Sequence, residues 1–149
     1  MTDIVIREAK AEDIETVVAM GQAFLLAGPY KDQISNPEEA TKYAFSMLKN
    51  INARILVAEE DGVVVGVFAF VVFPHYFSGE LTSGEMIWYV RPESRKGGVA
   101  LKLLAEGERI SRELGVKRMQ LTAPSEEIGK LYRYCGGYTK LEVSYQRVL

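Results

Sequence analysis

Cysteine, histidine and long apolar segments are scarce in this sequence. One cysteine, Cys135, and one histidine, His75, occur among the 149 residues. A disulfide within the chain is therefore excluded, and a structural zinc site is disfavoured because it needs several such ligands. The apolar run Val63–Phe73 is too short to cross a bilayer as a helix. Its valine and phenylalanine content favours a buried strand instead.

A signal peptide and a strong net charge are also lacking. Residues 1–10 contain no long apolar core of the kind that signal peptides have. The chain has 18 basic and 20 acidic residues, a formal net charge of −2, so no overall field favours nucleic acid. Its length fits one domain with a sizeable core. We therefore expect a soluble, cytoplasmic protein with a single domain at 1–149 and neither a nucleic-acid nor a membrane partner.

The order of apolar periods and turn residues predicts a mixed α/β domain. Asp61-Gly62 is typical of a tight type I′ turn between two strands. Strands are expected at residues 4–9, 54–60, 63–73, 85–90 and 117–123, with one long strand or a strand pair at 138–149. Helices are expected at residues 11–27, 37–49, 97–114 and 125–135. An aromatic-rich loop, 74–84, precedes the fourth strand.

The helix expected at 97–114 is amphipathic, with one apolar side that would pack on a sheet. The residues on this side are Val99, Ala100, Leu103, Leu104, Gly107, Ile110 and Leu114. Two basic residues and two glycines, 95–98, stand at its first turn. The unpaired N–H groups of a helix start attract anions, and glycine lets a ligand approach the backbone. A phosphate site is one interpretation, and a surface loop that happens to carry glycine and charge is the other.

The P-loop and the dinucleotide glycine pattern are both absent from the sequence. Residues 95–100, RKGGVA, instead fit Q/R-x-x-G-x-G/A after a strand that ends in YVRPES. This stretch resembles the acyl-CoA signature of the GNAT N-acetyltransferase superfamily. The resemblance covers nearly the whole chain, including the opening strand and helix, the hairpin and the late tyrosine helix LYRYCGGY. The aromatic loop and the following EMIWYVRPE are also similar to small acetyltransferases encoded by phages.

The resemblance implies a single GNAT-like domain. Its central sheet would be mixed and mostly antiparallel, with about six to seven strands flanked by about four helices. The chain departs from the family pattern at two places. Gly136-Gly137 replaces a single glycine after the late helix, and Ala123-Pro124 stands where many relatives have a cofactor-binding asparagine.

The resemblance also implies acetyl-CoA as the cosubstrate and no metal. Backbone groups at the end of the fourth strand would meet the pantetheine arm: Trp88, Tyr89 and Val90. The pyrophosphate would be held at the turn and the helix start: Arg95, Lys96, Gly97, Gly98, Val99 and Ala100. Among these, Val99 would contribute by packing rather than by contact.

Acetyl transfer to an amine needs a base, because a lysine-like amine has a pKa of about 10.4. Glu85 is the candidate, since it begins an apolar strand and burial raises the pKa of a carboxylate. Alternation would put Glu85 on one face with Ile87 and Tyr89. A surface glutamate at a strand end is the alternative interpretation, and Glu80 or His75 would be the next candidate bases.

A departing thiolate, whose thiol has a pKa of about 8.5, benefits from an acid. Tyr132 is the candidate because LYRYCGGY resembles the tyrosine helix of the family. The helix period predicts that Tyr132 points inward, whereas Tyr134 points away. The residues predicted to share the inward side are Ile128, Leu131 and Cys135. An ordinary core tyrosine is the alternative, and Cys135 is assigned no nucleophilic role because no histidine neighbours it.

We therefore expect an acetyl-CoA-dependent N-acetyltransferase that works by direct attack of an amine on the thioester. Tyr76, Phe77 and Tyr30 would border the acceptor pocket. The alternatives are a transferase that uses a longer acyl-CoA, a non-catalytic CoA-binding regulatory domain and a structural interaction protein. The acceptor, a small molecule or a peptide, stays open, as does pairing into a homodimer.

Overall fold

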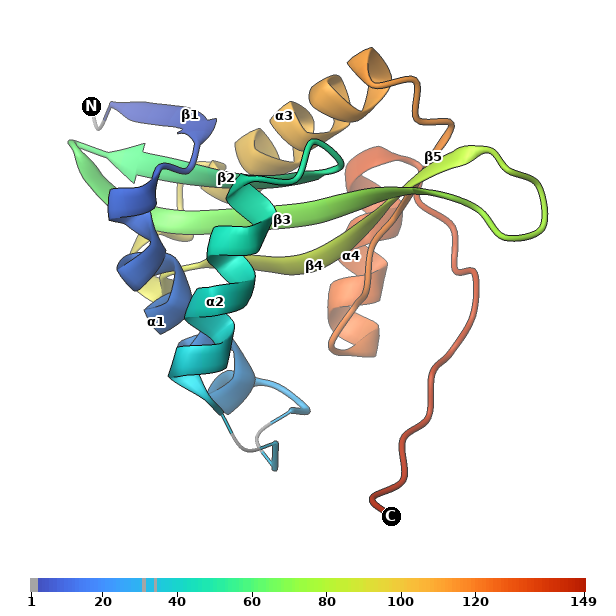
Figure 1. The fold of residues 1–149 in the computed structure, drawn as a ribbon, viewed down its shortest axis with the longest axis horizontal. Coiled ribbons are helices and arrows are strands. Elements are labelled where there is room, and N and C mark those ends of the chain that lie inside the picture. Colours follow the sequence, from blue (N-terminus) through green and yellow to red (C-terminus); the bar gives the residue numbers. More distant parts are fainter. Residues whose placement is uncertain (1–2, 31, 34) are drawn as a thin grey trace.

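The computed structural model describes residues 3–30, 32–33 and 35–149, without the side chain of Cys135. These residues form five strands, four α-helices and two short 3-10 helices (Figure 1). The strands are β1 (Ile4–Glu8), β2 (Ala53–Glu60), β3 (Val63–Pro74), β4 (Leu81–Val90) and β5 (Arg118–Gln120). The α-helices are α1 (Ile14–Ala27), α2 (Pro37–Leu48), α3 (Val99–Glu113) and α4 (Glu126–Gly136). No helix in this described part is both long and apolar enough to cross a membrane.

The strands lie side by side in the order β1-β2-β3-β4-β5. Neighbours are antiparallel except β4 and β5, which run parallel. Helices α1 and α2 cover one face of the sheet, and α3 and α4 lie over the other (Figure 1). Alternate side chains supply the two cores, so that Val57 packs beneath α1 and α2 while Leu56 and Phe68 pack beneath α3. The predicted mixed α/β architecture is confirmed.

Two local predictions, the Asp61-Gly62 turn and the apolar side of α3, are confirmed, and the cap of α2 also follows from nearby residues. Asp61 and Gly62 join β2 to β3 with φ angles of 51° and 82°, as a type I′ turn requires. The side chain of Asn36 caps α2 by accepting a hydrogen bond from the Glu39 N–H at 3.2 Å. Helix α3 buries its predicted apolar side, where Leu103 has no exposed surface. Local sequence signals therefore determine these elements.

The predicted sheet of six to seven strands is wrong, because the described residues form five. Residues 138–149, expected as a strand pair or one long strand, have no regular secondary structure and run past β5 as an extended tail (Figure 1). They alternate apolar and polar residues, but within the described chain no strand pairs with them, and most of their side chains are exposed. β5 is shorter than the predicted 117–123, because only Arg118–Gln120 pairs with β4.

Several elements begin at residues other than those predicted: α1 starts at Ile14 after a 3-10 turn at Ala11–Asp13, and two further shifts lie near the opening of the sheet. β4 begins at Leu81 rather than Glu85, because its pairing with β3 already starts there. α3 begins at Val99. Gly97 and Gly98 have φ angles of 103° and 76°, which are not helical, so both glycines precede the helix and Gly98 is its N-cap.

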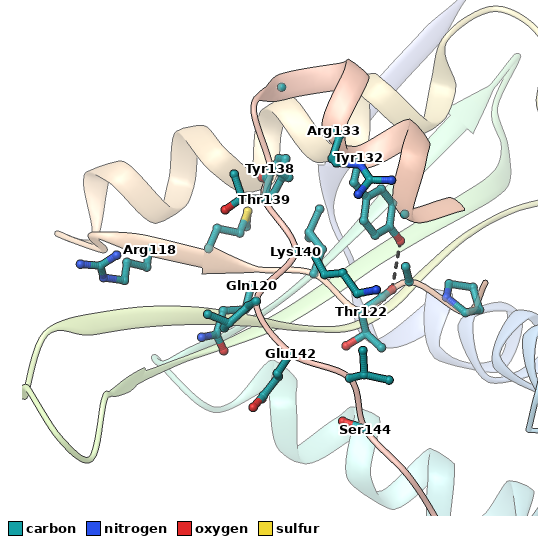
Figure 2. Close-up of a pocket in the computed structure, with 18 of the residues that line it drawn as sticks. Arg118, Gln120, Thr122, Tyr132, Arg133, Tyr138, Thr139, Lys140, Glu142 and Ser144 are labelled. Carbon is teal, nitrogen blue, oxygen red and sulfur yellow. Dashed lines mark hydrogen bonds between the residues drawn. The ribbon is translucent and has the colours of Figure 1, made fainter. Parts of the chain in front are cut away.

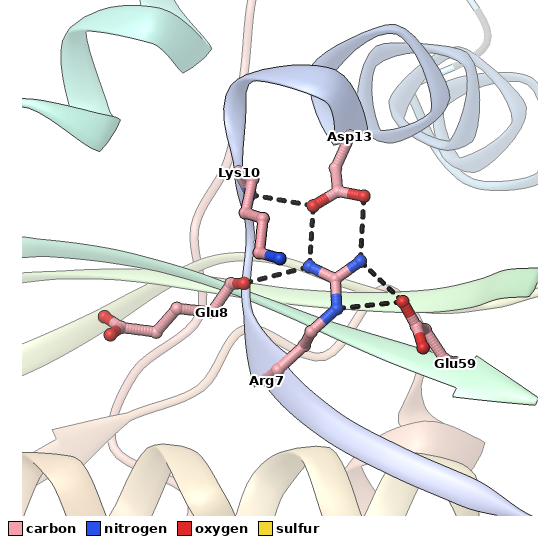
Figure 3. Close-up of polar contacts among 5 residues, drawn as sticks. All are labelled: Arg7, Glu8, Lys10, Asp13 and Glu59. Atoms are coloured by element: carbon pink, nitrogen blue, oxygen red, sulfur yellow. Dashed lines mark hydrogen bonds and ion pairs between the residues drawn. The ribbon is translucent and has the colours of Figure 1, made fainter. Parts of the chain in front are cut away.

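A partly buried ion cluster joins β1, β2 and the start of α1 (Figure 3). The Arg7 guanidinium donates to both carboxylate oxygens of Asp13, at 2.7 and 3.0 Å, and to Glu59 Oε1 at 2.7 Å. Asp13 Oδ2 also accepts from the backbone N–H of Lys10 at 2.7 Å. Hydrogen bonds from Arg7 hold the pKa of Asp13 below its usual value. The bidentate pair therefore fixes the start of α1 against the sheet.

Helix α3 packs tightly on the sheet at Gly107, where a Cβ would lie 2.5 Å from Cε1 of the buried Phe68 ring. Gly107→Ala should lower the free energy of unfolding by about 1–3 kcal/mol, the usual cost of overpacking. Gly129→Ala in α4 is the matched control, since its Cβ would meet the Ala123 Cβ at an ordinary 3.7 Å. Denaturant unfolding measures both changes. A Gly107→Ala protein as stable as the wild type would contradict this packing.

Candidate active site

The sheet opens between its two parallel strands. Their pairing covers residues 82–84 of β4 and Arg118–Gln120 of β5, and in the described chain no ladder joins them further on. β4 nevertheless continues to Val90, so residues 85–90 have a strand partner only on the β3 side. The backbone groups on their other edge can therefore bond to a ligand.

A β-bulge at Met86 decides the direction of the Glu85 side chain. Phe70 of β3 pairs with Glu85, and the preceding β3 residue pairs with Ile87. Met86 is thus the extra residue of a bulge. Directly opposite residues in antiparallel strands point to the same face, and Phe70 packs in the core beneath α3. Glu85 therefore faces the α3 side, and its predicted placement with Ile87 and Tyr89 is wrong because the bulge interrupts the alternation.

Tyr132 of α4 contacts both sides of the opening. Its ring stacks on Trp88 of β4, with ring centroids 5.4 Å apart and planes tilted by 22°. Its hydroxyl donates to the Thr122 carbonyl, two residues beyond β5, at 3.0 Å (Figure 2). One side chain thus spans from the unpaired part of β4 to the segment that leaves β5.

The two tyrosines of α4 point in different directions, as the helix period predicts. Tyr132 is half-buried, whereas Tyr134 is 87% exposed. Leu131, predicted to share the inward side, is 53% exposed, so that part of the prediction is wrong. Helix α4 packs at the end of the sheet, whereas α3 packs across its middle. The sheet therefore covers a smaller part of the surface of α4. The inward packing predicted for Cys135 concerns a side chain outside the described part.

The charge of Glu85 acts on the proton affinity of Tyr132. Burial raises the pKa of Glu85 to about 7, although a backbone hydrogen bond from Thr122 acts in the opposite direction. Burial also raises the pKa of Tyr132 above its usual value, and the charges of Glu85 and Tyr30 add to that rise. Near neutral pH, Glu85 can therefore take up or release a proton while Tyr132 keeps its own.

The turn before α3 leaves the first N–H groups of the helix open to solvent. Gly98 provides no side-chain cap, and a Cβ at Gly97 or Gly98 would meet no atom within 4 Å. No acidic side chain lies in the first turn, and Arg95 and Lys96 are exposed beside it. The positive end of the helix dipole and two cations therefore suit an anion. No cluster of metal-ligating side chains occurs within the described residues.

A cleft of about 1970 Å³ lies between β5, α4 and the extended segment 138–149 (Figure 2). Distant parts of the sequence meet in its lining, which includes Tyr30, His75, Phe77, Glu80 and Tyr132. Tyr76 stacks on His75 instead and is 81% exposed. His75 Nδ1 accepts a hydrogen bond from the Phe77 N–H at 3.2 Å. Of the three aromatic residues predicted to border an acceptor pocket, Tyr30 and Phe77 therefore line this cleft and Tyr76 does not.

Thr122 is the site residue that sequence reasoning missed. Its carbonyl accepts from Tyr132, and its backbone forms a hydrogen bond with Glu85. Because only backbone atoms of Thr122 take part, no motif marks it. The available signal is the adjacent Ala123-Pro124, since a proline ends pairing and turns the chain away from the sheet.

A comparison with protein families identifies the family of this chain. The model of the acetyltransferase (GNAT) family matches residues 11–136. This protein belongs to the GNAT acetyltransferase family. The matched range includes the open edge of β4, the glycine turn and helix α4. No curated protein sequence matched the chain.

Solved structures with low sequence identity share the GNAT fold of this chain. A predicted acetyltransferase with acetyl-CoA from Clostridium acetobutylicum has a TM-score of 0.80 at 20% identity, over 98% of this chain and 96% of that one. A ribosomal-protein-alanine N-acetyltransferase from Brucella melitensis has a TM-score of 0.76 at 20% identity, over 97% and 99%. An aminoglycoside acetyltransferase from an uncultured soil sample, in complex with sisomicin, has a TM-score of 0.76 at 17% identity, over 98% and 96%.

The raised pKa of Glu85 predicts that removing its charge stabilises the protein only at higher pH. The pKa rises from 4.5 to about 7 on folding, so the charged form opposes folding increasingly above pH 4.5 and fully above pH 7. Glu85→Gln should raise the free energy of unfolding at pH 8 by up to roughly 3 kcal/mol, because the pKa differs by about 2.5 between the unfolded and folded states and each pKa unit is worth 1.36 kcal/mol. It should change little at pH 4.

Denaturant unfolding at the two pH values measures this effect, and Glu80→Gln is the control. Glu80 is exposed at the hairpin turn, so its variant should show no comparable pH-dependent gain. An equal effect of Glu85→Gln at both pH values would mean that the glutamate is not buried as described.

Proposed function

We propose that this protein is an acetyl-CoA-dependent N-acetyltransferase that moves an acetyl group to a primary amine within a ternary complex. The observation that carries the proposal is the unpaired edge at 85–90, which leads through a short turn to the open helix start at Gly98. An extended pantetheine arm can bond to a strand edge, and a pyrophosphate can bind a helix N-terminus. One cosubstrate would occupy both features.

In this proposal the cosubstrate follows β4 and then α3. Backbone groups of Trp88, Tyr89 and Val90 bind the pantetheine arm. The residues around the pyrophosphate are Arg95, Lys96, Gly97, Gly98, Val99 and Ala100, of which Val99 is fully buried and acts by packing. A protein of the same fold is described with acetyl-CoA, which supports this choice of cosubstrate.

The chemistry assigns Glu85 and Tyr132 opposite tasks. The amine nitrogen attacks the thioester carbonyl carbon, and Glu85 takes the proton that the amine loses, directly or through water. N–H groups of β4 polarise the carbonyl oxygen. The C–S bond then breaks, and Tyr132 donates its hydroxyl proton to the CoA thiolate. A base with a pKa of about 7 next to a phenol that stays protonated supports this division.

We propose a primary amine on a small molecule or a peptide as the acceptor. One protein of this fold is described as a ribosomal-protein-alanine N-acetyltransferase. Another is described in complex with the aminoglycoside sisomicin. The cleft beside Tyr132, at about 1970 Å³, exceeds the usual ligand pocket of about 300–1,000 Å³, so it has room for either kind of acceptor. A non-catalytic CoA-binding domain and a longer acyl-CoA remain the rival functions, and similarity to phage-encoded members stays a prediction.

Gly98→Asp should block CoA binding, because it adds a carboxylate where the pyrophosphate would lie. The affinity should fall by at least about 100-fold, since a like-charge contact costs several kcal/mol. Gly62→Asp is the matched control: its φ of 82° resembles the 76° of Gly98, and its Cβ also meets no atom within 4 Å. Calorimetric titration with CoA should therefore give wild-type affinity for Gly62→Asp. Unchanged affinity in Gly98→Asp would remove the cosubstrate from this helix start.

Tyr132→Phe should retain the stacking on Trp88 and lose only the hydroxyl. If that hydroxyl protonates the thiolate, kcat should fall by roughly 10²–10⁴, with little change in CoA affinity. Tyr134→Phe, whose ring is exposed, should keep the wild-type rate. Release of free thiol from acetyl-CoA with a panel of amines measures the rate.

The same measurement separates the rival functions. A wild-type kcat in Tyr132→Phe would exclude the acid role. Wild-type protein that binds CoA but releases no thiol with any amine would favour the regulatory domain, and faster release from a longer acyl-CoA would favour the other rival.

A further inference from the structure

The Arg95 side chain contacts the end of β4. Its Nε donates to the Val90 carbonyl at 2.8 Å. Its guanidinium carbon lies 5.4 Å from the centre of the Tyr89 ring, a cation–π distance. Tyr89 and Val90 are the last two residues of β4, on the part of the strand that β5 does not pair with. Arg95 therefore closes back onto the strand that precedes it.

We propose that Arg95 is a positioning residue for the pantetheine site and that its guanidinium does not serve chiefly as a phosphate ligand. The inference rests on the proposed function, in which the backbone of Tyr89 and Val90 binds the pantetheine arm. Fixing the Val90 carbonyl and covering the Tyr89 ring holds that backbone in one conformation before the ligand arrives. A pre-organised strand edge binds more tightly because less conformational entropy is lost on binding.

The donor atom decides which side chains can perform this task. Nε of arginine is bonded to Cδ, and the amide nitrogen of glutamine occupies the same place in its side chain. Lysine has a methylene there, so it keeps the positive charge but has no donor at this atom. A phosphate ligand would instead depend on charge, which arginine and lysine share.

Two ligands separate a positioning residue from a phosphate ligand. CoA carries the pyrophosphate, whereas pantetheine contains the arm without any phosphate. The variants compared with the wild type are Arg95→Ala, Arg95→Gln and Arg95→Lys. Calorimetric titration measures their affinity for CoA, and ¹⁵N-resolved NMR titration measures the weaker binding of pantetheine. Lys49→Ala, which removes an exposed cation at the end of α2, controls for net charge. The amide spectra also show whether each variant is folded.

The expected result is a loss common to both ligands. Arg95→Ala and Arg95→Lys should weaken CoA and pantetheine by the same factor, about 10-fold for one charge-assisted hydrogen bond. Arg95→Gln should bind both within about threefold of the wild type, because a neutral amide replaces the charged donor. Should Arg95→Ala fail to fold, Arg95→Lys makes the same comparison.

Two results would overturn the inference. Arg95 would be a phosphate ligand if all three variants bound pantetheine as the wild type does, while Arg95→Lys kept the CoA affinity and Arg95→Gln lost it. Wild-type affinity for both ligands in Arg95→Ala would remove it from the site. Failure of the wild type itself to bind CoA would instead refute the proposed function, so the two failures are distinguishable.

Discussion

Backbone groups without a hydrogen-bond partner along one edge of a strand destabilise the folded sheet. β4 is in this state at 85–90, because its parallel pairing with β5 stops at Gly84 and Gln120. The neighbouring features all act on this opening. Tyr132 bridges it from α4 by contacting Trp88 and Thr122, and Arg95 satisfies the carbonyl at its far end. The opening is therefore built into the packing of the surrounding side chains.

The bulge at Met86 connects this opening to acid–base chemistry. Without the extra residue, Glu85 would share the face of Ile87, on the α1 and α2 side of the sheet. With it, Glu85 lies on the same side as Tyr132, in surroundings that raise its pKa to about 7. The charge of Glu85 in turn raises the pKa of Tyr132. A backbone irregularity thus places on one side of the sheet two groups whose proton affinities differ in the direction that the proposed acid–base mechanism uses.

Much of the fold could be predicted because its signals are local. Asp61-Gly62 specified its turn, the apolar side of α3 specified its packing, and the two glycines before α3 marked an open helix start. The sequence of α4 also separated Tyr132 from Tyr134. Each of these features depends on residues within a few positions of one another.

The remaining features depend on contacts that periodicity does not encode. The bulge at Met86 arises from how β3 and β4 align, and the length of β5 depends on where its partner diverges. Residues 138–149 show strand alternation, but a strand also needs a neighbour, and the described chain offers none. Thr122 acts through its backbone, so its identity carried no signal. The sequence pattern thus did not determine which strands pair, or over which residues.

The central claim is that CoA completes the unpaired edge of β4. Amide hydrogen exchange, followed by mass spectrometry with and without CoA, tests it most directly because it reports on the backbone groups themselves. The account predicts that CoA slows exchange in peptides covering 85–90 and the start of α3, and leaves β1 and β2 unchanged. Binding of CoA without added protection at 85–90 would contradict it.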